Sequence, residues 1–263
     1  MRAVRPPSAP PAWRALSVCA LAGAAAHIGP AGTWLPPVRR SLFPALDGRG
    51  RPGHIALTFD DGPARHSTPY FLDTLDRLAV RATFFVLGRA LLEAPDTGRE
   101  LVARGHEVAV HGWDHRRPWW PTPLRDLSEL RRTVAAVGAV CGVRPRWYRP
   151  PYGVLTGGRW AAARRVGLRP VLWSAWGREW VSGATARSVA DRVGRGLHGG
   201  GTVLLHDTDR ASGADSWRVA LQALPELVEC CRRQGFTIGP LRDHGIGVEN
   251  ARPGGQEQTG RLC

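Results

Sequence analysis

Apolar and polar residues follow two alternating patterns along most of the chain. From residue 51 onward, brief runs rich in Val, Ile, Leu and Phe are followed by stretches whose apolar residues recur every three or four positions. The first pattern is typical of buried strands and the second of amphipathic helices. Seven strands are predicted, over residues 55–59, 82–86, 107–110, 146–149, 169–173, 202–205 and 236–238.

The stretches between these runs predict the helices. Residues 67–78 illustrate the pattern, because their apolar side chains fall on one helical face. Further helices are expected over residues 100–104, 124–140, 160–166, 186–197 and 217–233. Strands that alternate with helices form a parallel sheet. Seven such units predict one α/β domain with a closed or nearly closed barrel, in which functional side chains lie where the strands end.

The first 50 residues differ from the rest of the chain. Arg2, Arg5 and Arg14 precede a run of small and apolar residues, 15–26, that is too short for a membrane span. A basic start, a short apolar middle and a small-residue end resemble a signal peptide, so we expect a secreted or cell-envelope protein. The alternative is a loosely packed arm on a cytoplasmic protein. Apolar residues within 33–47 indicate that this later part packs against other residues.

These patterns divide the chain into three parts. Residues 1–50 are a signal-like or loosely packed arm, and residues 51–243 form a single domain. Residues 244–263 are polar and rich in glycine, which predicts a flexible tail.

The composition adds a strong positive charge. The chain has 36 basic residues, all of them arginine, against 22 acidic ones, for a formal net charge of +14. A hydrophobic content of 43% is that of a globular protein. The basic residues form no stripe with interleaved aromatic residues, so nucleic acid is not an expected partner. The charge favours association with an anionic cell wall or membrane surface, although the coding bias of a GC-rich genome would also produce it.

Two adjacent carboxylates close the first predicted strand. Asp60 and Asp61 are followed at once by Gly62 and Pro63, so the sequence predicts a strand, an acidic pair and a turn. Neighbouring side chains of a strand point in different directions. Two adjacent carboxylates are also unfavourable unless a cation or an arginine compensates them. One of the pair is therefore expected to bind a cation while the other stays free to accept a proton.

A pair of histidines follows the strand predicted over 107–110. His111 and His115 are four residues apart, which places them on one face of a helical turn and suits two imidazoles that bind one cation. With Asp61 they form a His₂Asp set that leaves coordination positions open. Zn²⁺ is the simplest choice for these ligands, and Co²⁺ fits them as well. A helix-capping role for Asp61 is the alternative, but the next predicted helix begins only at Ser67.

Two further strand ends carry candidate catalytic groups. In the Arg-Pro-Pro-Tyr-Gly sequence at 149–153, the prolines fix the backbone, which could hold an N–H group toward a developing oxyanion. Arg149 could brace a carboxylate. His206 is a candidate general acid that Glu179 could orient. Taken alone, these residues would be interpreted as a rigid turn with a surface arginine and as a structural histidine.

These four motifs, in this order and each after a predicted strand, resemble those of the NodB-like polysaccharide deacetylases, carbohydrate esterase family 4. The resemblance covers roughly residues 52–240 and so identifies the 51–243 segment as a domain of that kind. It implies a distorted (β/α) barrel with fewer than eight complete units, in agreement with about seven parallel strands. It also implies a metal-dependent hydrolase of amide bonds.

The resemblance assigns the charged residues to two tasks. Asp60 corresponds to the general base, and Arg149 corresponds to the arginine that braces it. Asp61, His111 and His115 correspond to the metal ligands.

The later motifs correspond to groups that contact the acyl group and the leaving amine. Tyr152 matches the tyrosine whose backbone N–H helps to stabilise the oxyanion, and His206, in a Leu-x-His motif, matches the general acid. Leu204 and Trp180 are expected to form the pocket for the acyl methyl group.

The fourth motif departs from the family pattern. The family has Asp-x-x-Asp-Trp where this chain has Trp176, Glu179 and Trp180. Glu179 keeps a carboxylate near His206 on a longer side chain, whereas Trp176 removes one. Gly112 also stands where the family often has a small hydroxyl residue. These changes bear on substrate choice and rate more than on the metal.

The sequence therefore predicts a metal-dependent enzyme that removes N-acetyl groups from an aminosugar polymer such as peptidoglycan or chitin. It leaves the oligomeric state open, with a monomer favoured. One alternative keeps the chemistry but changes the substrate to a small N-acyl or cyclic amide. Another is a sugar-binding relic that has lost turnover, against which the presence of both Asp60 and His206 argues.

Overall fold

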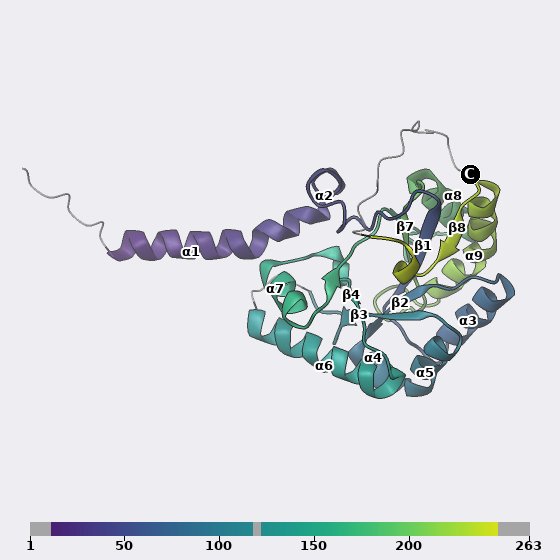
Figure 1. The fold of residues 1–263 in the computed structure, drawn as a ribbon, viewed down its shortest axis with the longest axis horizontal. Coiled ribbons are helices and arrows are strands. Elements are labelled where there is room, and N and C mark those ends of the chain that lie inside the picture. Colours follow the sequence, from purple (N-terminus) through teal and green to yellow (C-terminus); the bar gives the residue numbers. More distant parts are fainter. Residues whose placement is uncertain (1–11, 118–121, 247–263) are drawn as a thin grey trace, which may run out of the picture.

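A parallel sheet flanked by helices forms the body of the protein, and one long helix projects away from it (Figure 1). The computed structural model describes residues 12–117 and 122–246. Its strands are β1 (His54–Asp60), β2 (Thr83–Leu87), β3 (Glu107–Gly112), β4 (Trp147–Tyr148), β5 (Arg169–Pro170), β6 (Ala175–Trp176), β7 (Thr202–His206) and β8 (Thr237–Gly239). The α-helices are α1 (Ala12–Ile28), α2 (Pro36–Leu42), α3 (Thr68–Arg77), α4 (Gly88–Glu93), α5 (Pro95–Ala103), α6 (Pro123–Cys141), α7 (Gly157–Arg165), α8 (Ala186–Gly196) and α9 (Ser216–Arg233). Short 3₁₀ helices are η1 (Gly29–Trp34), η2 (Pro151–Gly153) and η3 (Leu241–Asp243).

The strands follow the order β5-β4-β3-β2-β1-β7-β6, and β8 pairs with the start of β1. Each of these pairings is parallel. The path begins at β5 and ends at β6, so the curled sheet is an incomplete barrel rather than a closed one. The predicted distorted (β/α) barrel of about seven parallel strands in a single domain is therefore confirmed.

The two faces of β1 have different surroundings. Ile55, Leu57 and Phe59 belong to the main hydrophobic core, which lies between the sheet and the helices. There Phe59 stacks on Phe84, with 4.9 Å between the ring centroids. Ala56 points the other way, into a smaller cluster inside the barrel. Because side chains alternate along a strand, Asp60 shares the interior face with Ala56.

Several element boundaries differ from the sequence prediction. The strand β6 was not predicted, because two residues are too few to show a periodic pattern. The strands β4 and β5 are also shorter than the predicted 146–149 and 169–173. The prediction of a helix over 100–104 captured only the end of α5 and missed α4, from which Pro95 separates it.

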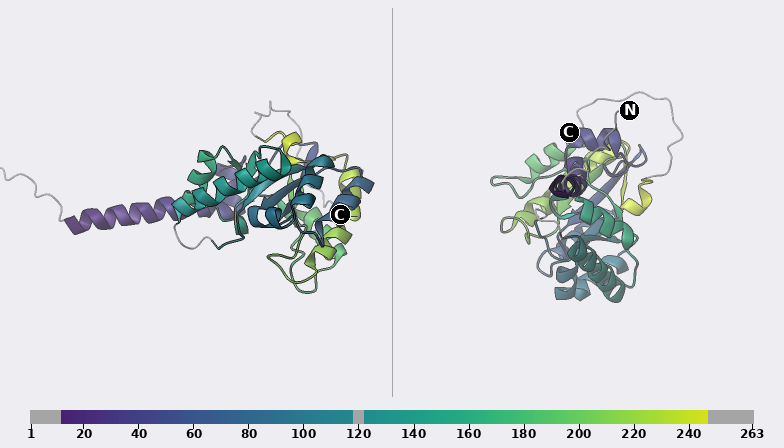
Figure 2. Two further views of the ribbon diagram at one scale, coloured as in Figure 1. Left: turned by 90° about the horizontal axis from the view of Figure 1, so that it is seen from below. Right: turned by 90° about the vertical axis from the view of Figure 1, so that its left-hand side faces the viewer.

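The first part of the described chain combines a projecting helix with a docked segment. Figure 2 shows α1 extending beyond the body of the protein, with Leu16 and Leu21 about 70% exposed. None of the described helices is both long and apolar enough to span a lipid bilayer. Beyond α1, the backbone N–H of Leu172 donates to the carbonyl of Leu46, and Phe43 packs edge-on against Trp160. The segment predicted to pack therefore does so, although Leu42 remains exposed.

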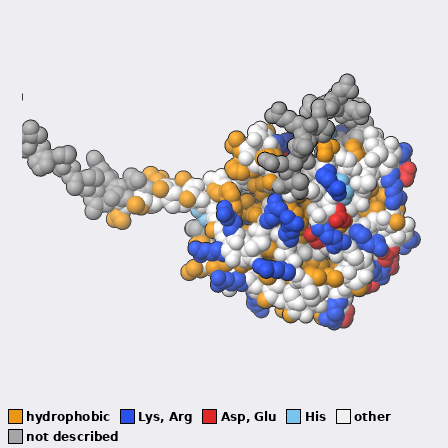
Figure 3. All heavy atoms as spheres, viewed as in Figure 1, with side chains coloured by type: hydrophobic (Ala, Val, Ile, Leu, Met, Phe, Trp, Pro, Cys, Tyr) orange, Lys and Arg blue, Asp and Glu red, His pale blue; other side chains and the backbone are white. Residues whose placement is uncertain are grey.

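Arginine side chains are scattered over the face seen in Figure 3, with acidic side chains among them. The flexible tail predicted over 244–263 lies outside the described residues from position 247 onward.

Candidate active site

The strand register brings the predicted site residues to one edge of the sheet. Asp60 at the end of β1 lies directly beside His206 at the end of β7. On the other side, Val110 of β3 pairs with Tyr148 of β4, so His111 and Arg149 follow at the same level. Because all the strands are parallel, motifs far apart in the sequence meet at their carboxyl ends.

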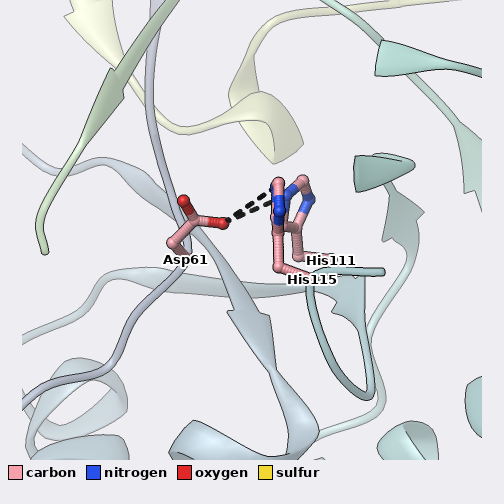
Figure 4. A group of neighbouring side chains, drawn as sticks. All are labelled: Asp61, His111 and His115. Atoms are coloured by element: carbon pink, nitrogen blue, oxygen red, sulfur yellow. Dashed lines mark ion pairs between the residues drawn. The ribbon is translucent and has the colours of Figure 1, made fainter. Parts of the chain in front are cut away.

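Asp61, His111 and His115 form a cluster of candidate metal ligands (Figure 4). The Oδ1 atom of Asp61 lies 3.3 Å from Nε2 of His111 and 3.6 Å from Nε2 of His115. Donor atoms about 2.0–2.2 Å from one tetrahedral cation would be separated by roughly this much. The same Oδ1 atom is buried and has no hydrogen-bond partner. An unpartnered buried carboxylate oxygen that faces two imidazoles fits a bound divalent cation.

The protonation states of this cluster also suit a metal. Burial of Asp61 alone would raise its pKa, but the close imidazoles, His111 first among them, hold that pKa well below its usual range. Burial lowers the pKa of His115 to about 4. A carboxylate and a neutral imidazole are the forms that coordinate cations.

The two histidines do not share a helical turn, so that part of the sequence interpretation is wrong. His111 lies on β3 and His115 lies in the bend that follows. Gly112 between them has a φ of +135°, which L side chains rarely adopt. The strand ends in this bend, which returns the second imidazole toward Asp61. The family departure at Gly112 therefore coincides with a backbone conformation that glycine permits.

A backbone contact fixes the orientation of the His111 ring. Its Nδ1 atom lies 2.8 Å from the carbonyl oxygen of Arg149. A carbonyl only accepts, so Nδ1 carries the proton and Nε2 presents its lone pair toward Asp61.

Arg149 is fully buried and contacts the carboxylate predicted to act as the base. Its Nη1 atom donates to Oδ1 of Asp60 at 2.7 Å and to Oγ1 of Thr58 at 2.8 Å. Its Nη2 atom donates to the carbonyl of Leu172, and the guanidinium lies over the ring of Phe85. These contacts hold Asp60 through one oxygen and leave its Oδ2 atom for other partners.

Glu179, which is buried, and His206, which is partly exposed to the cavity, form the second charged pair. Oε1 of Glu179 lies 2.8 Å from Nδ1 of His206 and accepts the backbone N–H of the same residue at 2.7 Å. Burial lowers the pKa of His206, but the charge and hydrogen bond of Glu179 outweigh that effect and raise it to about 9. The longer glutamate side chain at this position therefore still reaches the histidine.

Tyr152 lies at the rim of the site rather than in its interior. Its backbone is in the left-handed region, with φ of +61°, and its side chain is 45% exposed. The ring packs edge-on against His115, with 4.4 Å between the centroids.

Most of these residues line one cavity of about 580 Å³, although Arg149 and Glu179 are not among its lining residues. The aspartates and histidines of its lining, here called the polar floor, are Asp60, Asp61, His111, His115 and His206. Leu204 and Trp180, predicted to form the acyl pocket, also line the cavity. Four indole side chains, here called the tryptophan wall, are Trp34, Trp173, Trp176 and Trp180. Trp34 and Trp173 were not predicted to belong to the site, because no local motif separates a cavity tryptophan from a core one.

A further buried carboxylate supports the turn after the acidic pair. Asp207 accepts a hydrogen bond from Thr68 and lies against Gly62, where an added Cβ would come within 2.4 Å of its Oδ2 atom. Burial raises the pKa of Asp207 to about 7. No role was predicted for Asp207 from the sequence, since it directly follows the more conspicuous His206.

Comparisons with known proteins agree with this geometry. Residues 47–171 match the family model described as polysaccharide deacetylase. The chitooligosaccharide deacetylase of a Bradyrhizobium species is 36% identical over 194 residues, which are 71% of this chain and 88% of that protein. A peptidoglycan-N-acetylglucosamine deacetylase of Listeria monocytogenes is 36% identical over 160 residues, which are 61% of this chain but only 34% of that longer protein.

A solved structure extends the likeness to three dimensions. The family 4 carbohydrate esterase from Streptomyces lividans, in complex with acetate, is 30% identical and superposes with a TM-score of 0.64. The match covers 71% of this chain and 92% of the esterase. Since both this esterase and the Bradyrhizobium relative are matched over most of their length, the chain belongs to the NodB-like polysaccharide deacetylases of carbohydrate esterase family 4, which are hydrolases of amide bonds.

Proposed function

We propose that this protein removes N-acetyl groups from an aminosugar polymer of the cell envelope, with a divalent cation bound by Asp61, His111 and His115. The observation that carries the proposal is the unpartnered Oδ1 atom of Asp61 between two imidazoles, in the same cavity as Asp60 and His206. The named relatives act on chitooligosaccharide and on peptidoglycan, which are both N-acetylated aminosugar polymers. We propose Zn²⁺ as the cation, with Co²⁺ as a functional substitute.

The cation would supply Lewis acidity, polarising the acetamide carbonyl and lowering the pKa of a water molecule. The chain supplies the proton transfers. Asp60, oriented by Arg149 through one oxygen, accepts a proton from the attacking water at its other oxygen. The water oxygen bonds to the carbonyl carbon, and the carbonyl oxygen takes up the negative charge.

His206 completes the reaction as the general acid. Its Nδ1 atom is held by Glu179, so its Nε2–H is free to donate to the amine nitrogen as the carbon–nitrogen bond breaks. Acetate and the free amine are the products. The backbone N–H of Tyr152 donates to the oxyanion, and Leu204 and Trp180 enclose the acyl methyl group.

Acetate release tests the proposal. Purified protein with added Zn²⁺ or Co²⁺ is incubated with N-acetylglucosamine oligomers and with peptidoglycan, and parallel samples contain a chelator. The Asp60→Asn and His111→Ala variants serve as controls. Metal-dependent release that both substitutions abolish supports the deacetylase and its site together.

Release from small N-acyl amides but from neither polymer would instead favour the small-amide alternative, which the altered fourth motif with Trp176 and Glu179 allows. Binding of the oligomers without any acetate release would favour a sugar-binding relic.

A further inference from the structure

The segment between α1 and the sheet contributes a side chain to the cavity. This segment, here called the docking arm, comprises residues 29–47 and contains η1 and α2. Trp34 at the end of η1 is 49% exposed and lines the same cavity as Asp61 and His206. The family model matches only from residue 47 onward, so Trp34 belongs to a part of the chain that precedes the match.

A buried ion pair fixes the docking arm. Arg39 is only 5% exposed, and its Nε atom donates to Oδ1 of the fully buried Asp47 at 2.6 Å. Burying two charges is costly, and apolar residues of similar volume often give equal stability. The pair is therefore better explained by the geometry that it imposes than by stability alone.

The same guanidinium connects the arm to the tryptophan wall. One Nη atom of Arg39 donates to the carbonyls of Thr33 and Trp34, at 3.0 and 3.3 Å. The other donates to the carbonyl of Trp173 at 2.9 Å. Trp34 and Trp173 both line the cavity, so one side chain holds the backbones of two wall residues that are far apart in sequence.

We propose that Trp34 contacts the substrate and that Arg39, fixed by Asp47, is its positioning residue. The ligand is an N-acetylaminosugar ring, whose apolar C–H face would stack on the indole while its acetamide group reaches the polar floor. This assignment rests on the proposed function, because it uses the same substrate class. Such a ring requires a large apolar surface on one side and a few convergent polar groups on the other, which the tryptophan wall and the polar floor supply.

The test compares three single variants and one double variant of the full chain. Trp34→Ala removes the stacking surface, and Arg39→Gln removes the charge that positions it. Leu35→Ala is the matched control, since Leu35 is the next residue, is 51% exposed and is not among the described residues that line the cavity. For each protein, the trimer of N-acetylglucosamine is used to measure KM and kcat with Zn²⁺, and calorimetric binding in the presence of a chelator.

Trp34→Ala is expected to raise KM roughly three- to tenfold and to weaken binding to the chelated protein by a similar factor, with kcat nearly unchanged. Leu35→Ala should match the wild type in both measurements. Arg39→Gln should raise KM less than Trp34→Ala does, and it should add little in the Trp34→Ala background, because it acts through the same ring.

Wild-type values for Trp34→Ala would overturn the assignment of Trp34. Fully additive effects of the two substitutions would overturn the positioning role of Arg39, and circular dichroism of each variant identifies any loss of folding. If the wild type binds the trimer without releasing acetate, the proposed function fails, while the Trp34 comparison still decides this inference by binding. If the wild type neither binds nor hydrolyses the trimer, the inference fails as well.

Discussion

The polar floor and the tryptophan wall face the same cavity but come from different kinds of structure. The floor residues lie at or just after the ends of β1, β3 and β7. Asp60, Asp61 and His111 are at least 97% buried, and His115 and His206 lie against the carboxylates of Asp61 and Glu179. The wall residues come from the docking arm and from residues 173–180, where only Trp176 lies on a strand, the two-residue β6, and Trp34 is half exposed. A rigid strand end can fix a reacting group, whereas a loop surface can vary without disturbing it. We therefore expect the floor to control turnover and the wall to control binding.

Removal of a candidate metal ligand should have the largest effect. His111→Ala is expected to lower zinc affinity by more than about 100-fold and to abolish acetate release, because one of the three proposed protein ligands is lost. Zinc content after dialysis, measured by mass spectrometry, checks this. His66→Ala is the control, since His66 is exposed and pairs with Asp209 rather than with the floor. Full zinc retention in His111→Ala would remove His111 from the ligand set.

The Asp60→Asn substitution should separate chemistry from metal binding. It is expected to lower kcat by roughly 10²- to 10⁴-fold, the usual contribution of a general base, while zinc content stays at the wild-type level. Asparagine retains an oxygen for Arg149 but cannot accept the proton. An unchanged kcat would show that Asp60 is not the base.

A smaller loss of turnover is expected when the support of His206 is weakened. Glu179→Gln should lower kcat roughly 10- to 100-fold, because a charged hydrogen bond to the imidazole is replaced by a neutral one. KM and zinc content should not change. Glu179→Asp restores the family's carboxylate and should recover part of the activity, which a loss of packing alone would not explain. Equal rates for the Gln and Asp variants would contradict the positioning role.

A change in the tryptophan wall should alter KM rather than kcat. Trp176→Ala is expected to raise KM for the oligomers roughly two- to tenfold and to leave kcat within about twofold of the wild type. Trp176 packs against both Trp173 and Trp180, at centroid distances of 5.7 and 5.6 Å, so its removal opens the wall without touching the floor. A large fall in kcat with KM unchanged would contradict the expectation that the wall controls binding and the floor controls turnover.

Outside both regions, a buried histidine should affect stability but not turnover at neutral pH. Burial and the nearby charge of Arg81 lower the pKa of His106 to about 4, so this residue stays neutral in the folded protein while the unfolded chain takes up a proton below about pH 6.5. Its contribution to stability is therefore complete above that pH and is lost as the pH falls toward 4, by on the order of 3 kcal/mol.

Denaturant unfolding between pH 7 and 4 measures this dependence. His106→Asn keeps an acceptor for the backbone N–H of Ala82 but cannot be protonated in this range, so the fall in stability should be smaller in this variant. An identical pH dependence in both proteins would show that His106 does not contribute.

The sequence by itself determined the barrel and most of the chemistry of the floor. The strand–helix alternation predicted the parallel sheet. In a (β/α) fold, functional residues follow the carboxyl ends of the strands, so the motif after each predicted strand identified candidate residues. Charge alone predicted that Arg149 braces a carboxylate and that Glu179 orients His206, and the family resemblance named Asp60 as that carboxylate. The structure contains both contacts. The assignment of catalytic roles to these residues remains a prediction.

Only the tertiary structure decided how His115 reaches Asp61 and which tryptophans line the cavity. The four-residue spacing suggested a helical turn, but the end of β3 and the backbone of Gly112 impose a bend that a local pattern does not contain. Trp34 and Trp173 are 139 positions apart, and the guanidinium of Arg39 joins their backbones. Periodicity reports which face of an element is buried, whereas the neighbours that a loop acquires depend on the closure of the whole sheet.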